Sequence, residues 1–167
     1  MLFRSRGKTR SAHLIYPNGL PTVAALVPPD DPERVPVPLA MIPGTLDPLS
    51  VIAVLLRAVR ETGRCEAAAR GFDGRRVLVF AATTGGEEEL PPTPRSRFAG
   101  RALRCDFTNE MLAGYRAGAG READTAIRHG TLWLAPPAPG EEAVPVRGTM
   151  ATRWVGDVML YLTAAAP

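Results

Sequence analysis

Residues 43–82 place a capped helix directly before a hairpin, and this order constrains the fold more than any other part of the chain. Asp47 can accept a hydrogen bond from a free N–H of the first helical turn, and Pro48 suits the first helical position because no donor is needed there. The pattern predicts a helix over 49–62 that ends at Gly63. Because apolar side chains cover most of its surface, we expect this helix to be covered on more than one side.

The hydrophobic period changes after the helix. Alternating side chains predict paired strands over 64–70 and 74–82, joined by a turn at Phe72, Asp73 and Gly74. Asp-Gly is a strong hairpin signal because glycine adopts positive φ at little cost. Asp73 is therefore interpreted as a turn residue rather than as a catalytic acid.

The remainder of the chain contains more short strands than helices. Further strands are predicted at 12–16, 22–27, 100–108, 131–134, 144–154 and 157–163, the last two meeting at residues 155–157. Residues 83–94 are expected to form an acidic, proline-containing loop, and 109–128 to be irregular or partly helical. This order predicts a mainly β (α+β) fold, a curved antiparallel sheet or partial barrel with one long apolar helix packed on it.

Two segments near the N-terminus lack the pattern of a sheet interior. Residues 1–11 are basic and polar and are expected to be disordered, leaving a single domain over 12–167. Residues 28–43 are too rich in proline for a helix or a central strand. We expect an extended surface connector there, with its apolar side chains as anchoring points, namely Val35, Val37, Leu39 and Ile42.

Composition excludes several classes of function. The net charge of +3 is small, and the arginines, which make up all the basic residues except Lys8, are dispersed among acidic residues, so we expect no nucleic-acid partner. The longest strongly apolar run, 51–56, is far shorter than the roughly 20 residues that cross a bilayer, so no transmembrane segment is predicted. The basic N-terminus is not followed by the apolar run of an export signal.

Cys65 and Cys105 are the only cysteines, and their separation excludes a redox CxxC motif. With only two distant histidines, they also make a poor metal site. A structural disulfide across neighbouring strands is the most economical interpretation, and closing that loop would stabilise the fold by roughly 4 kcal/mol. The alternative is a pair of independent buried thiols.

The sequence contains no recognisable catalytic motif. It lacks a serine-nucleophile elbow, a Walker glycine loop, an HExxH pair and an EF-hand loop. We therefore expect no enzyme, no catalytic residue, no metal and no cofactor. The residues that would have to be inspected for any activity are Asp73, Arg75, His129 and Tyr115.

Several short motifs occur in a distinctive order along the chain: GTLDPLS at the helix start, GRC, FDGRR before a strand, GRALRC, LWLAP and VPVRGTMATRWVGDVMLYLT. On these motifs the chain, from about Ile15 to Thr163, resembles a bacterial exported-protein family, domain of unknown function 3108. The matching residues are Asp47, Pro48, Leu49, Ser50, Cys65, Phe72, Asp73, Gly74, Arg75, Gly100, Cys105, Gly114, Tyr115, Pro145, Val146 and Gly156.

The resemblance implies export to the periplasm or cell envelope, a mainly antiparallel β fold and no assigned activity. It also implies that a signal peptide and further N-terminal strands precede the portion present here. The oxidising periplasm would suit a disulfide. The expected function is that of a non-enzymatic structural or interaction module of the envelope, whose partner would be another envelope protein. The alternative is a periplasmic carrier of a lipid-like or other apolar ligand, held in a groove between helix and sheet that Ile52, Leu55 and Leu56 would line.

Overall fold

The structure, a computed structural model, describes residues 2–5, 8–29, 32–96, 98–152 and 156–163. Its strands are β1 (Leu2–Ser5), β2 (Lys8–Ile15), β3 (Thr22–Val27), β4 (Ala67–Phe72), β5 (Val77–Leu90), β6 (Gly100–Ala113), β7 (Arg128–Ala135), β8 (Val144–Thr152) and β9 (Gly156–Tyr161). Its helices are α1 (Pro48–Thr62), α2 (Arg121–Thr125) and the 3-10 turns η1 (Pro17–Gly19), η2 (Leu39–Met41) and η3 (Gly118–Gly120). The fold is mainly β, as the sequence predicts.

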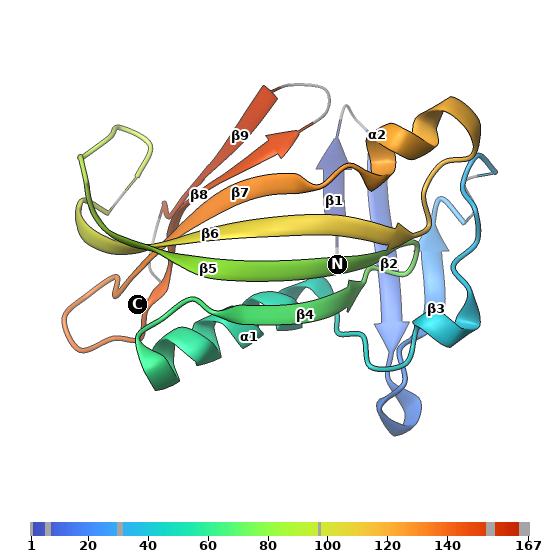
Figure 1. The fold of residues 1–167 in the computed structure, drawn as a ribbon, viewed down its shortest axis with the longest axis horizontal. Helices are drawn as coiled ribbons and strands as arrows, with labels where there is room; N and C mark the ends of the chain where they lie inside the picture. Colours follow the sequence, from blue (N-terminus) through green and yellow to red (C-terminus); the bar gives the residue numbers. More distant parts are fainter. Residues whose placement is uncertain (1, 6–7, 30–31, 97, 153–155, 164–167) are drawn as a thin grey trace. The chain divides into compact units, whose positions relative to one another are not determined.

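The strands form two sheets in which neighbours in the chain are neighbours in space. One is three-stranded, in the order β1-β2-β3, and the other is six-stranded, in the order β4-β5-β6-β7-β8-β9 (Figure 1). The register of β6, β7, β8 and β9 is antiparallel throughout, with Cys105 opposite Leu132 and Thr131 opposite Thr149. The predicted antiparallel sheet is therefore confirmed.

The chain divides into two compact units. The first comprises Met1–Ile52, Ala69–Val79 and Glu110–Ala126, and the second comprises Ala53–Ala68, Phe80–Asn109 and Ile127–Pro167. The three-stranded sheet belongs to the first unit and β7, β8 and β9 to the second, whereas β4, β5 and β6 contribute residues to both. The expectation of a single domain over 12–167 stays a prediction.

The core of the first unit is a cluster of Phe72, Val77 and Ala113. The partly buried side chains packed against this cluster are Leu14, Val37, Met41, Ile42 and Leu112. Val37 and Ile42 therefore anchor the proline-rich segment as predicted. Leu39 does not, because its side chain is 83% exposed in η2.

The core of the second unit gathers Leu90, Ala102, Ala135 and Val146, with Trp133 packed beside them. The prediction of a loop over 83–94 is wrong for most of its length, because β5 runs on to Leu90. Local acidity does not end this strand, since Leu90 is buried and Glu88 accepts a 2.9 Å hydrogen bond from the Trp133 indole N–H. The acidic run thus lies in a paired strand rather than in a solvated loop.

Other boundaries differ by a few residues. The strand predicted over 100–108 extends to Ala113, and α2 accounts for the partly helical character expected of 109–128. β8 and β9 cover the last two predicted strands. Trp154 and Val155, at the end of one predicted strand and in the following turn, lie outside the described residues.

Helix α1 has the predicted ends. The Asp47 carboxylate accepts hydrogen bonds from the N–H groups of Leu49 at 2.9 Å and Ser50 at 3.1 Å, and Gly63 follows the helix with φ of 71°. Only Val51 and Leu55, one turn apart, are buried, while Leu49 is 68% exposed. Ile52, Val54, Leu56, Ala58 and Val59 are half-buried, so cover on more than one side of the helix stays a prediction. Within the part of the chain that the structure describes, no helix is long and apolar enough to span a membrane.

Of residues 1–11, those that the structure describes form strands where the sequence predicts disorder. β1 pairs antiparallel with β2, with Phe3 opposite Arg10 and Ser5 opposite Lys8. β2 in turn pairs with β3. Ladder hydrogen bonds satisfy the backbone of this segment, so its polar side chains do not prevent a strand.

Candidate functional site

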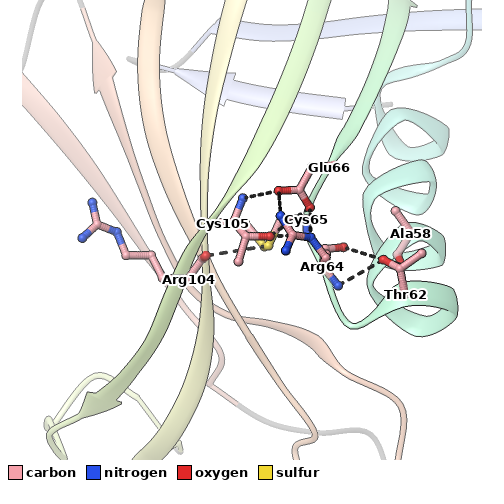
Figure 2. Close-up of polar contacts among 8 residues, drawn as sticks. Ala58, Thr62, Arg64, Cys65, Glu66, Arg104 and Cys105 are labelled. Carbon is pink, nitrogen blue, oxygen red and sulfur yellow. Dashed lines mark hydrogen bonds and ion pairs between the residues drawn. A yellow bond between two sulfur atoms is a disulfide. The ribbon is translucent and has the colours of Figure 1, made fainter.

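A disulfide joins Cys65, just before β4, to Cys105 in β6, both within the second unit (Figure 2). The two Cα atoms are 5.6 Å apart and both side chains are 0% exposed. This confirms the predicted bridge and excludes the alternative of two independent thiols. Its burial within the sheet makes it a structural bond rather than a reactive centre.

A small polar network surrounds Cys65. The Cys65 N–H donates to the Thr84 hydroxyl at 2.8 Å, and that hydroxyl donates to Glu66 at 3.0 Å. Arg64 makes two hydrogen bonds to the Glu66 carboxylate, at 3.0 and 3.1 Å (Figure 2). The side-chain hydrogen bonds from Arg64 are the largest cause that lowers the pKa of Glu66, to about 2. The network fixes the chain around the disulfide and contains no group poised for acid–base catalysis.

A polar cavity of about 520 Å³ lies in the second unit, along β5 to β9. Asp106 is one of its lining residues, and its carboxylate accepts hydrogen bonds from Arg104 Nε at 3.0 Å and from the Thr131 hydroxyl at 2.7 Å. A Cβ at Gly85 would lie 2.7 Å from the Asp106 carboxylate, so the absence of a side chain there gives this carboxylate room. His129 and Thr149 also line this cavity.

The four residues singled out for a possible activity are divided between the two units. His129 belongs to the second unit, whereas Asp73, Arg75 and Tyr115 belong to the first. Asp73 stabilises the turn after β4, because its carboxylate accepts hydrogen bonds from the N–H groups of Arg75 at 2.9 Å and Arg76 at 2.8 Å. His129 lines the polar cavity of the second unit together with Thr131 and Thr149.

The first unit contains an apolar cavity of about 590 Å³, which we call the β3 cavity. Its lining residues are Val23, Leu26, Pro29, Pro32, Arg34, Val35, Pro36, Val37, Ile42, Phe72, Gly74 and Arg75. Three segments supply them: β3, the proline-rich segment and the end of β4 with its turn. The volume falls within the range of about 300–1,000 Å³ that is usual for small-molecule sites.

Backbone and charged groups hold the proline-rich wall of the β3 cavity. The Val35 N–H donates to the Tyr115 carbonyl at 2.9 Å, and the Ala117 N–H donates to the Glu33 carbonyl at 2.8 Å. The Arg34 guanidinium donates to the Gly114 carbonyl and lies 3.9 Å from Asp124. These bonds hold residues 33–35 of the wall against residues 114–117 and Asp124.

The turn after β4 also lines the β3 cavity, through Gly74 and Arg75. Gly74 has φ of 89° and Gly114 has φ of 81°. A Cβ at Gly114 would overlap the Arg75 carbonyl oxygen and lie 2.8 Å from Arg76 Cα, so only glycine permits this close approach. The turn therefore holds Arg75 at the cavity through backbone packing as well as through Asp73.

The predicted motif residues lie at two places, the start of α1 and the turn after β4. Asp47 and Pro48 begin α1 and line a further cavity of about 230 Å³, whose lining also includes Tyr16. Burial, and secondly the charge of Asp47, raise the pKa of Tyr16. Phe72, Gly74 and Arg75 instead line the β3 cavity.

Comparison of the chain with protein-family models, with curated proteins and with solved structures finds no match.

The groove predicted between helix and sheet stays a prediction. Ile52, Leu55 and Leu56 line none of the three cavities described above, and Leu55 is completely buried. The β3 cavity was missed because its walls come from distant parts of the sequence. One signal was present, since the apolar residues that alternate with proline from Val35 onward were expected to face the protein.

No metal site emerges from the geometry. Across the described ranges, no group of three or more histidine, cysteine, aspartate or glutamate side chains could hold a metal ion.

Proposed function

We propose that this chain is a non-catalytic binding protein of the bacterial cell envelope that holds an apolar ligand in the β3 cavity. The supporting observation is the cavity itself, whose lining is apolar except for Arg34 and Arg75. Burying the apolar surface of a ligand there would supply the main driving force for binding. The proposed ligand site thus lies at the proline-rich segment and not in the groove between helix and sheet that the sequence suggested.

The proposed location rests on two further features. The Cys65–Cys105 disulfide suits an oxidising compartment. The resemblance to the exported-protein family suggests the periplasm in particular. The proposal also retains the curved sheet or partial barrel on which α1 packs, as the sequence predicts.

The test is binding of N-phenyl-1-naphthylamine, whose fluorescence rises in apolar surroundings. The decisive variant is Val35→Trp, because Val35 lines the β3 cavity yet is 37% exposed, so a larger side chain can enter the cavity without disturbing a packed core. Its matched control is Leu39→Trp, in the same segment but outside the lining. We expect Val35→Trp to weaken binding by about tenfold, or about 1.4 kcal/mol, and the control to match the unaltered protein.

Two results would contradict the proposal. One is the absence of a saturable fluorescence change with the unaltered protein. The other is equal binding by Val35→Trp and Leu39→Trp. Either would leave a structural or interaction module as the better explanation of the fold.

A further inference from the structure

We propose that the ligand of the β3 cavity is a single-chain amphiphile ending in a carboxylate, and that Arg75 binds this carboxylate. The inference rests on the proposed function, because it assigns the polar end of the same apolar ligand. The inference follows from the two charged residues of the cavity lining, Arg34 and Arg75, and from the groups to which each is bound.

Arg34 is one of the two charged residues in the lining, and its charge is already balanced. Its guanidinium is only 12% exposed and lies 3.9 Å from Asp124, a carboxylate that is 5% exposed. Arg116 contacts the same carboxylate at 3.2 Å and lies 3.8 Å from Glu33. Among the described residues, Arg34 and Arg116 are thus both paired with carboxylates, and Arg34 serves to hold the wall.

Arg75 is the other charged residue of the lining, and its situation differs. Its guanidinium donates to the Pro28 carbonyl, which is a neutral acceptor. The adjacent carboxylate, Asp73, pairs instead with Arg76, whose Nε lies 2.7 Å from the carboxylate oxygen. Among the described residues, Arg75 thus has no carboxylate partner.

A guanidinium has five N–H donors in a planar fork, which matches the two oxygens of a carboxylate. Among the described lining residues, Arg75 alone has a positive charge without a carboxylate partner, which favours a monoanion, whereas a phosphate monoester has about −1.5 to −2 charges at pH 7. In a cavity of about 590 Å³, the apolar chain of such a ligand would contact the apolar lining and its carboxylate would pair with Arg75. Long-chain fatty carboxylates have this chemistry.

The experiment compares three probes with the same twelve-carbon chain: dodecanoate, dodecan-1-ol and dodecyl phosphate. Each displaces N-phenyl-1-naphthylamine from the purified chain at neutral pH. We expect dodecanoate to bind at least about tenfold more tightly than the alcohol, because a hydrogen bond to a charged group is worth about 1.5–3 kcal/mol. We also expect it to bind more tightly than the phosphate.

The variant Arg75→Gln removes the charge and should abolish the preference for dodecanoate over the alcohol. Arg75→Lys, which keeps the charge but loses the fork, should retain part of the preference. Arg95→Gln is the matched control, because Arg95 is exposed and lies outside the cavity lining. It should behave as the unaltered protein does.

The outcomes separate this inference from the proposed function. Equal binding of dodecanoate and dodecanol by the unaltered protein would overturn the carboxylate but support the apolar cavity. Tighter binding of dodecyl phosphate would also overturn the carboxylate. A preference that persists in Arg75→Gln would overturn the role of Arg75, and failure of all three probes to bind would overturn the proposed function itself. The comparison among probes uses only the unaltered protein, so it decides the matter even if a variant fails to fold.

Discussion

The disulfide gives a quantitative prediction for stability. The bond closes a loop with a sequence separation of 40 residues. In the chain-entropy model, a cross-link over a loop of this size stabilises the folded state by about 4 kcal/mol, because it restricts the unfolded chain. For a chain of this length, that corresponds to a midpoint of thermal unfolding about 8–16 °C higher than without the bond.

The perturbation is the double variant Cys65→Ala with Cys105→Ala, compared with the oxidised protein by urea unfolding followed by circular dichroism. We expect the double variant to lose about 4 kcal/mol of unfolding free energy. Since both cysteines are 0% exposed, the comparison with reduced protein requires reduction in denaturant before refolding. Reduced protein and the double variant should then unfold alike, and reductant should not affect the variant.

The magnitude also defines the refutation. If the oxidised protein and the double variant differed by less than about 1 kcal/mol, the bond would not restrict the unfolded chain as the model requires. A large difference between the reduced protein and the double variant would instead show that the alanines themselves disturb the buried site.

Two further predictions concern single residues. Gly114→Ala should lower the unfolding free energy by more than about 2 kcal/mol, because its φ of 81° and its approach to the Arg75 carbonyl both exclude a Cβ; a change below about 0.5 kcal/mol in urea unfolding would contradict this geometry. Glu66 has a pKa of about 2 in the folded protein against an ordinary value of 4.5, chiefly because of Arg64. Its contribution to stability should therefore be complete above pH 4.5 and be lost as the pH falls toward 2, and Glu66→Gln should remove this part of the pH dependence. Identical acid unfolding curves for the variant and the unaltered protein would count against the Arg64–Glu66 interaction.

The features that the sequence predicts well are those that short-range chemistry determines. The Asp47 cap and the Asp73 turn each use hydrogen bonds within three residues, so a few letters of sequence contain the whole interaction. The disulfide was predictable for a different reason, since Cys65 has only one possible partner.

The features that the sequence did not predict depend on distant partners. Residues 87–89 are acidic and exposed, yet they lie in β5, where the Glu88 carboxylate accepts a hydrogen bond from the distant Trp133 indole. The N-terminal strands likewise depend on pairing across β1, β2 and β3. The β3 cavity is the strongest case, because three separate segments meet there and none of them alone has the pattern of a binding site.

The proline-rich wall has a consequence for how selective the β3 cavity can be. Pro29, Pro32 and Pro36 line it, and because proline fixes its own φ, the backbone at these three positions samples few conformations. A pre-organised wall loses little entropy when a ligand enters, which favours affinity. It also yields little to a ligand of the wrong shape, so chain length and branching would be discriminated by rigidity rather than by additional contacts.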